Sequence, residues 1–505
     1  MKRLFTFLIM TVAACILKAQ VTTENYILAR RMMNEEGTSC TAQIEYYDAL
    51  GRPYQQIWTA IQNGSAVNKN SAALQEYDLS GRITKSWLTT YAGNKVYLPP
   101  ASFKDTAISL WNNDSLPYTQ NIYDASPLNR LTLQYGAGAA WYNGGHGNRI
   151  TYMRNIATAG NELACKRYII NGTSLSGGSA NYPAGTLHVV KATDEDGHIS
   201  YTFTDRLGRT VLIRQMNGTT QHDTYYVYDS RNNLCFVLQP EYQFTNSLSK
   251  HAFQYKYDGY GRCSEKTVPG VGTERYDYDA ADRLIFSQNG NQNVKNHWTY
   301  YEYDSLNRLT EQGECNGKDT NSKTVWMKNY YDNYNFCSQT GFNNSNFPAG
   351  TVNARGFLTG SEATVLGSST KLYSAYYYDI KGRMTKTVRN NLLGGYDVTT
   401  TTYTFTDRPQ TVTHIHTASG KTSITEVYTY IYDHADRLTK VQHKIGNTQI
   451  TLLDCTYDDL GRLKTRTPHG IASAKLTYDY NLRGWLTGIS GGKFSQNLYY
   501  NTGNG

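Results

Sequence analysis

The sequence has little of what marks an ordinary α/β enzyme or a membrane protein. It contains only 11 prolines in 505 residues, and its hydrophobic content is 39%. Beyond the first residues no segment has eighteen consecutive apolar residues, so the mature chain is not expected to span a membrane. Tyrosine is abundant instead, with 44 residues. This composition favours a β-rich array.

Cysteines are too scattered to form a disulfide framework or a zinc site. Seven remain when Cys15, which lies in the first apolar run, is set aside, and no Cys-x-x-Cys pair occurs. We expect buried single thiols, although an export compartment would permit an occasional bridge such as Cys315 to Cys337.

Catalytic and ligand-binding signatures are also missing. There is no Gly-x-Ser-x-Gly elbow and no His-Glu-x-x-His pair. Asp194–Gly197 resembles half of a calcium loop, but the later oxygen ligands and the closing Glu are missing, so a hairpin turn explains it better. His414 and His416 alternate on one strand face without a third metal ligand at suitable spacing. Gly144–Gly147 has no Lys and no following helix pattern, as a phosphate loop would need. We therefore predict no catalytic, cofactor-binding or metal-binding residue, no cofactor and no enzymatic activity.

The first nineteen residues predict export. Lys2 and Arg3 precede an apolar run from Leu4 to Leu17, and Ala19 stands before Gln20. This is the pattern of a signal peptide cleaved between Ala19 and Gln20, so we expect a secreted or outer-surface protein. Anchoring as a lipoprotein through Cys15 is the alternative.

The formal net charge of +8 becomes +5 without Lys2, Arg3 and Lys18. The remaining basic residues are dispersed, so no nucleic-acid partner is expected.

A short motif recurs eleven times. In each copy Tyr is followed by Asp or Asn, two free positions, and then Gly, Asn or Asp, and eight copies place Arg next. The copies begin at Tyr47, Tyr77, Tyr228, Tyr257, Tyr278, Tyr303, Tyr331, Tyr378, Tyr432, Tyr457 and Tyr480.

Each copy predicts the tip of a β-hairpin. Gly, Asn and Asp tolerate positive φ, so a slot filled from that set is a left-handed backbone position. Asp at the first position of a type I turn bonds the backbone beyond it. The predicted structural turn residues are Asp48, Gly51, Asp78, Gly81, Asp258, Gly261, Asp279, Asp304, Asp379, Gly382, Asp433, Asp458 and Gly461.

The flanks of the motif predict strands that assemble into one sheet. Aromatic and β-branched residues alternate with polar ones on both sides of the tips, and copies from Asp229 to Asp332 lie 29, 21, 25 and 28 residues apart. Because one hairpin is marginal in water, the units must stack edge to edge, with the tyrosines pairing across strands. The fold class is therefore all-β, an array of repeated hairpins.

These residues resemble the YD repeats of the RHS family, whose tandem Tyr-Asp-x-x-Gly-Arg pattern occurs in bacterial polymorphic toxins, insecticidal toxin complexes and animal teneurins. The resemblance covers about residues 46 to 500 and implies a spiralling sheet that builds a hollow shell. Tyr123–Arg130, with Gly138–Trp141 and Gly144–His146, is similar to the N-terminal segment of RHS proteins from the Bacteroidetes. Toxins of this family carry a core segment and then a variable toxic domain. Neither pattern occurs here, so we expect a chain truncated before them.

The organisation follows from these patterns. We expect a signal peptide at 1–19, an N-terminal β-rich segment at 20–120 with two early repeats, a Bacteroidetes-type segment at 121–192, and a repeat array at 193–505. Within them we expect a short helix at 66–76 and a flexible Gly/Ser-rich loop at 171–180. We interpret Tyr201–Arg209 as a bulged repeat, and 343–372 as a longer excursion in which a binding loop could sit.

Three functions remain open. The resemblance implies a shell that holds a toxic C-terminal domain, with an immunity protein as a further partner. A binding module that grips surface glycans or proteins through its aromatic faces is the second. An enzyme, including a self-cleaving one, is the third, and it has no assignable active site.

Overall fold

The structure is a computed structural model that describes residues 24–62, 65–66 and 70–500. Its strands are antiparallel and, in this described part, all but β10 and β11 belong to one long open sheet. The predicted all-β fold class is confirmed. Two compact units make up the chain: unit 1 holds residues up to 129, 134–145 and from 377 onward, and unit 2 holds 130–133 and 146–376.

Unit 1 begins with a meander of antiparallel strands. They are β1 (Asn25–Met32), β2 (Ser39–Tyr47), β3 (Pro53–Gln62), β5 (Asn70–Tyr77), β6 (Ile83–Gly93) and β7 (Tyr118–Tyr123), with β4 (Ser65–Ala66) paired to β3. Successive side chains alternate between the two faces, which buries Ile44, Ile57, Leu74 and Trp87 in one cluster. The helix expected at 66–76 is wrong. From Asn70 onward the chain is β5, in which Ala72 and Leu74 alternate into the core.

Helix α1 (Pro100–Leu110) covers part of this cluster, and the sequence patterns did not predict it. Pro100 occupies the first turn, where its missing N–H costs nothing. Phe103 and Ala107, four residues apart on one helix face, are fully buried, and the Phe103 ring meets the edge of Trp87 at 6.3 Å.

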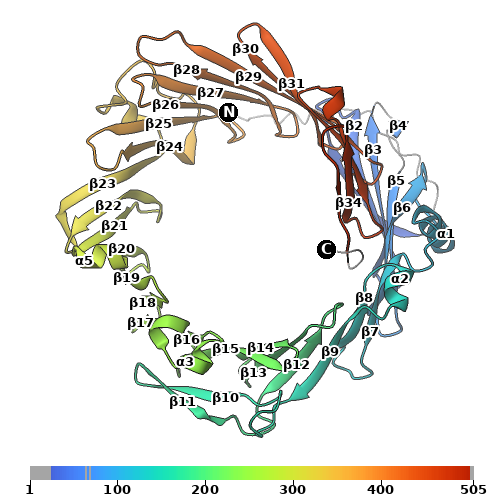
Figure 1. Cartoon of the computed structure of the whole chain (residues 1–505). Coiled ribbons are helices and arrows are strands. Elements are labelled where there is room, and N and C mark those ends of the chain that lie inside the picture. Colours follow the sequence, from blue (N-terminus) through green and yellow to red (C-terminus); the bar gives the residue numbers. More distant parts are fainter. Residues whose placement is uncertain (1–23, 63–64, 67–69, 501–505) are drawn as a thin grey trace, which may run out of the picture. The chain divides into compact units, whose positions relative to one another are not determined.

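The remainder of unit 1 is a run of repeat hairpins. It contains α2 (Ala139–Asn143), β26 (Met384–Asn390), β27 (Tyr396–Tyr403), β28 (Pro409–His416), β29 (Ile424–Tyr432), β30 (Leu438–Ile445), β31 (Thr448–Tyr457), β32 (Leu463–Pro468), η2 (Ala472–Ala474), β33 (Leu476–Tyr480), β34 (Leu486–Gly491) and β35 (Gln496–Asn497). These last repeats contact the N-terminal strands (Figure 1). Arg31 pairs with the nearly buried Asp436 at 3.2 Å, and Arg483 Nε donates to the Ala137 carbonyl at 3.0 Å.

Unit 2 is a continuous antiparallel run. Its strands are β9 (Gly147–Arg154), β12 (His188–Thr193), β13 (Ile199–Thr204), β14 (Thr210–Asn217), β15 (Thr220–Tyr228), β16 (Leu234–Leu238), β17 (Ala252–Tyr257), β18 (Cys263–Val268), β19 (Gly272–Tyr278), β20 (Leu284–Gln288), β21 (His297–Tyr303), β22 (Leu309–Asn316), β23 (Asp319–Asp332) and β24 (Ala354–Thr364). β8 (Leu131–Tyr135) and β25 (Lys371–Tyr378) have residues in both units. The short helices of unit 2 are α3 (Tyr242–Thr245), α4 (Leu248–His251), α5 (Gly290–Val294) and η1 (Asn335–Ser338).

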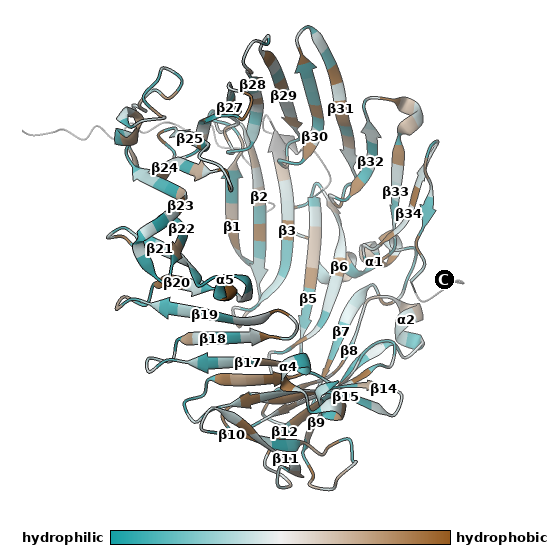
Figure 2. Ribbon diagram, turned by 60° about the vertical axis from the view of Figure 1, so that its left-hand side comes forward, coloured by the Kyte–Doolittle hydropathy of each residue, from teal (hydrophilic) through white to brown (hydrophobic). Residues whose placement is uncertain are grey.

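The predicted flexible loop at 171–180 is instead part of a β-hairpin, β10 (Lys166–Asn171) and β11 (Ser174–Asn181). The hairpin packs on the sheet face of β13–β16, where Tyr168 meets Tyr225 at 5.0 Å over the main core of this unit. Figure 2 shows the hydrophobic stretches of these strands in brown beside β10 and β11. The glycines serve close packing rather than flexibility, because a Cβ on Gly178 would lie 2.5 Å from the Tyr168 ring.

The longer excursion from the repeat lies at 333–353, earlier than the predicted 343–372, whose second part is β24 and the start of β25. It folds back over β23–β25 as an aromatic cluster. Phe342 contacts Phe336 at 4.8 Å and Tyr373 at 4.9 Å between ring centroids. The Phe336 ring sits where a Cβ on Gly360 would be, at 2.4 Å.

Candidate functional site: the joints between repeats

In the eight copies that carry Arg, the repeat turn is closed by its own Asp and Arg. In the copy at Asp258, the backbone N–H of Asp258 donates to the Arg262 carbonyl at 2.9 Å, and that of Gly261 donates to the Asp258 carbonyl at 3.1 Å. One carboxylate oxygen of Asp258 accepts from the N–H groups of Tyr260 and Arg262, and the other accepts from Arg262 Nε at 2.7 Å. Gly261 has φ +83°. The turn therefore engages both carboxylate oxygens of a short acidic side chain.

Ten of the eleven copies have this geometry, with the fourth residue at positive φ. Those residues are Gly51, Gly81, Asn232, Gly261, Asp282, Asn307, Gly382, Asp436, Gly461 and Gly484. The copy at Tyr331 is not a hairpin tip, and that expectation is wrong. There the chain leaves for the 333–353 excursion, and Asp332 pairs with Ala354 of β24 and accepts the N–H of Gly356.

Four further turns share the geometry although their sequences depart from the motif. One lies at Asn391, whose fourth residue Gly394 has φ +71°. Thr404 replaces Asp, with Asp407 at φ +67°. Asp194 is followed by Gly197, with His198 in the place of Arg. The turn at Asp205, expected to be a bulged repeat, has a register shift between Phe203 and Thr204, and the other repeats show the same shift. Thr204 simply takes the place of the tyrosine.

The repeat tyrosine joins each hairpin to the one before it. Its hydroxyl donates to the backbone carbonyl of the residue that follows the arginine position of the preceding turn, at 2.6 to 3.2 Å, thirteen times in the described part of the chain. The donors are Tyr77, Tyr123, Tyr152, Tyr228, Tyr257, Tyr278, Tyr303, Tyr331, Tyr403, Tyr432, Tyr457, Tyr480 and Tyr500. Partial burial raises the pKa of Tyr257 to about 12, so the hydroxyl keeps its proton at neutral pH.

The repeat arginine reaches forward to the same tyrosine. In ten joints of the described chain its guanidinium lies 4.4 to 5.2 Å from the centroid of the next repeat's ring. Arg262 also donates to the Asp279 carbonyl at 2.8 Å and to Asp282 at 2.7 Å. Each Arg thus binds the Asp behind it and the Tyr ahead of it, and this arrangement couples neighbouring hairpins.

Electrostatics in the turns suit a structural role. The Arg283 backbone N–H and then its guanidinium lower the pKa of Asp279, and the same two groups of Arg308 lower that of Asp304. A carboxylate held ionised by fixed donors is a poor general acid or base near neutral pH.

Replacing Gly261 by alanine is expected to lower the free energy of unfolding by about 1 to 2 kcal/mol, the cost of left-handed φ at a residue with a Cβ. Gly259 lies in the same turn outside the left-handed region, and a Cβ there meets nothing within 4 Å. Gly259→Ala is therefore the matched control, with a neutral or slightly stabilising effect. Urea unfolding of both variants measures the contrast, and equal midpoints would count against the turn geometry.

Acid is expected to unfold the repeats through these carboxylates. Because the folded pKa of Asp48, Asp279 and Asp304 lies below the ordinary value of 3.8, their contribution is complete above that value and is lost as pH falls through the folded pKa. Thermal midpoints measured from neutral pH downward should drop below about pH 4. A triple Asp→Asn variant at these positions should show a smaller drop, and an unchanged profile would refute the assignment.

The other residues singled out in the sequence lie apart from the joints. His416 Nδ1 is 2.6 Å and His414 Nε2 is 3.5 Å from one oxygen of Asp397, which lies on the adjacent strand β27. The sequence interpretation missed Asp397, which only strand register brings close. Among the described residues no group of three His, Cys, Asp or Glu side chains is placed to hold a metal ion. Ala19 and Gln20 lie outside the described residues.

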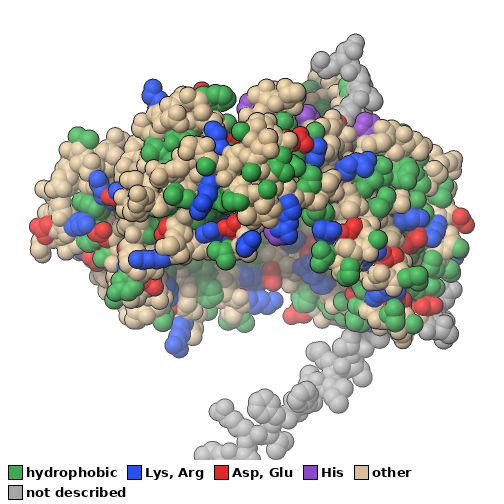
Figure 3. Space-filling model, turned by 90° about the horizontal axis from the view of Figure 1, so that it is seen from below, with side chains coloured by type: hydrophobic (Ala, Val, Ile, Leu, Met, Phe, Trp, Pro, Cys, Tyr) green, Lys and Arg blue, Asp and Glu red, His purple; other side chains and the backbone are tan. Residues whose placement is uncertain are grey.

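Cysteines and surface charge follow simple patterns. The seven cysteines of the described chain are free, Cys315 and Cys337 among them, and most are buried. Burial raises the pKa of the Cys315 thiol. Acidic and basic side chains are interspersed on the face seen in Figure 3 and do not gather by sign. In the described residues no helix has the length and apolarity needed to cross a membrane.

Comparison with known proteins places the fold. A family model described as a domain of unknown function, DUF6443, matches residues 19–154, a range that includes β1 to β9. The chain has the fold seen in crystal structures of TcdB2-TccC3. It superposes on TcdB2-TccC3-Cdc42 with a TM-score of 0.61 over 92% of this chain at 14% identity. On TcdB2-TccC3 without its hypervariable C-terminal region the TM-score is 0.62, over 92% of this chain at 15% identity. The match spans 21% of those chains. No curated protein matches.

Proposed function

We propose that this chain is the scaffold portion of an exported RHS-type protein of the Bacteroidetes kind, whose repeat sheet forms part of a hollow shell around a toxic C-terminal effector. The effector and its immunity protein are the proposed partners, and the chain acts without catalysing a reaction. Cleavage between Ala19 and Gln20 would release it for secretion or display at the outer surface.

One observation carries the proposal: the polar side chains of the repeats are engaged in joining hairpins. Asp, Arg and Tyr of each repeat are engaged with one another or with the neighbouring backbone, as at Asp258, Arg262 and Tyr278. A long sheet with such joints can enclose volume, because each hairpin adds to the edge of the one before. The proposed role of this sheet is therefore to form the wall of a shell, not to hold an active site.

The fold comparison adds support. The solved relatives are larger, since this chain corresponds to about a fifth of their length. One of them is described as lacking a hypervariable C-terminal region, so the complete relative has such a region. By analogy the present chain would work joined to further repeats and to a variable effector.

Protease protection tests the proposal. The natural gene is sequenced past codon 505, and its complete product is digested with proteinase K beside the isolated C-terminal domain. The effector should resist digestion in the complete product and be degraded when alone. A gene that encodes nothing beyond the repeats, or equal digestion of the two forms, would contradict an enclosing shell.

A further inference from the structure

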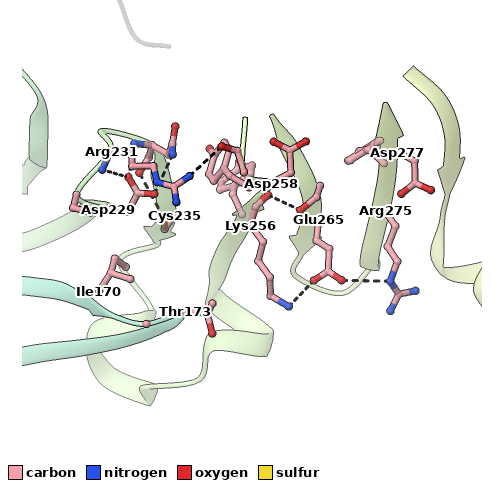
Figure 4. Close-up of a pocket in the computed structure, with 18 of the residues that line it drawn as sticks. Ile170, Thr173, Asp229, Arg231, Cys235, Lys256, Asp258, Glu265, Arg275 and Asp277 are labelled. Atoms are coloured by element: carbon pink, nitrogen blue, oxygen red, sulfur yellow. Dashed lines mark hydrogen bonds and ion pairs between the residues drawn. The ribbon is translucent and has the colours of Figure 1, made fainter. Parts of the chain in front are cut away.

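A polar pocket of about 750 Å³ opens on one face of the unit 2 sheet, beside the tip of the β10–β11 hairpin. Figure 4 shows Ile170 and Thr173 of the hairpin on one side, and a row of Lys256, Glu265 and Arg275 across β17, β18 and β19 on the other. The charged row of Lys256, Glu265 and Arg275 takes no part in the joints, although the lining also includes Tyr257 and Asp258, which do.

Ion pairs link the charged side chains of the floor. Glu265 accepts from Lys256 Nζ at 2.5 Å and lies 3.5 Å from Arg275 Nε. Asp277 pairs with Lys318, whose ammonium lies 4.1 Å from the centroid of the Trp298 ring. These groups remain accessible: the side chains of Lys256, Arg275 and Asp277 are 59%, 36% and 40% exposed. The charged groups of the floor are therefore open to solvent and within reach of a ligand.

The β10–β11 hairpin and the 333–353 excursion, two departures from the repeat, lie on this same face. The β10–β11 hairpin covers Tyr225. Tyr225 is the cross-strand partner of Leu238, and Leu238 is the partner of Ala252, so these side chains lie on one face. Side chains two apart along β17 point the same way, so Lys256 lies on that face too. At the other end Phe336 of the 333–353 excursion lies over Gly360. Cross-strand partners continue this face toward the excursion: Glu302 lies opposite Glu311, Glu311 opposite Lys328, and Lys328 opposite Glu362. The pocket occupies the uncovered stretch next to the hairpin.

The lining indicates the ligand. It contains four basic and four acidic side chains, which are Arg231, Lys256, Arg275, Lys318, Asp229, Asp258, Glu265 and Asp277. Nucleic acid or an acidic peptide would require an excess of positive charge, which this balance does not offer. Carboxylates have about four acceptor positions and guanidinium has five N–H donors, so both keep free capacity after pairing. Closely spaced donors and acceptors on a neutral wall suit a ligand whose groups both donate and accept.

We propose that this pocket binds a neutral oligosaccharide, with the sugar hydroxyls bridging the carboxylates and the basic groups and with the β10–β11 tip forming one wall. This site goes beyond the scaffold role. It would let the wall recognise a polysaccharide of a cell surface or of its surroundings, whether or not an effector is enclosed.

A glycan array and one matched pair of variants test the site. The chain without its leader is applied to an array of neutral and acidic oligosaccharides, and neutral ligands that bind are titrated by calorimetry. Glu265→Gln should weaken binding at least about tenfold, because a hydrogen bond to a charged group is lost. Glu274→Gln is the control, since Glu274 is the next acidic residue across the hairpin and faces the opposite side, toward Lys266.

The outcomes separate clearly. The site is supported if neutral glycans bind, if Glu265→Gln weakens that binding, and if Glu274→Gln changes it by less than about twofold. The two variants should have equal thermal midpoints. Binding confined to sulfated or uronic glycans overturns the ligand class. No binding, or binding unaffected by Glu265→Gln, overturns the site. None of these results bears on the protease test of the shell, so the two proposals fail independently.

Discussion

Replacing Asp223 by alanine is expected to lower the free energy of unfolding by about 3 to 5 kcal/mol, because it leaves a buried charge without its partner. The Arg214 side chain is 3% exposed and donates from Nε and Nη2 to the two Asp223 oxygens at 2.7 and 2.6 Å. Its third nitrogen, Nη1, donates to the Glu162 carbonyl at 2.8 Å. This pair ties the sheet of unit 2 to the segment that leads into the β10–β11 hairpin.

The comparison variant is Lys266→Ala, which breaks the exposed pair of Lys266 with Glu274 at 3.8 Å. That change should cost less than about 1 kcal/mol, because surface pairs are screened and mobile. Urea unfolding followed by tryptophan fluorescence gives both values. If Asp223→Ala cost no more than Lys266→Ala, the buried pair would not have the structural role assigned to it.

Phe103→Ala should have a similarly large effect, about 3 to 5 kcal/mol, in unit 1. Phe103 is the fully buried residue through which α1 contacts Trp87, so its removal leaves a cavity that the helix cannot fill. Asp105→Ala, on the exposed face of the same helix, should be neutral or slightly stabilising. Differential scanning calorimetry of the two variants distinguishes them. Equal thermal midpoints would mean that α1 is not anchored as the structure shows.

The turn geometry could be predicted because it is local. Asp258, Gly261 and Arg262 are close in sequence, and their roles follow from which residues accept positive φ and which side chains bond their own backbone. The all-β fold class followed from the same signals. The strand at Asn70–Tyr77 was mistaken for a helix although Ala72 and Leu74 alternate into the core.

The individual contacts of the joints and the pocket could not be predicted, since both depend on register. Each repeat shifts register just before its tyrosine, as between Lys256 and Tyr257, and this shift changes which residues share a face. Sequence therefore does not reveal that Lys256, Glu265 and Arg275 align. The hydroxyl bond of Tyr278 to the Cys263 carbonyl spans 15 residues and needs the paired strands to exist. Thr404 escaped notice because a hydroxyl replaces the carboxylate there.

A double-mutant cycle on Arg262 and Tyr278 tests most directly the claim that the repeats are coupled through their Arg and Tyr side chains. The guanidinium of Arg262 lies 4.9 Å from the ring centroid of Tyr278 in the next hairpin. Unfolding free energies of Arg262→Ala, Tyr278→Ala and the double variant should show a coupling of about 0.5 to 1 kcal/mol or more. The same cycle between Arg262 and the distant Tyr457 should give none. Additive effects for Arg262 and Tyr278 would contradict the account.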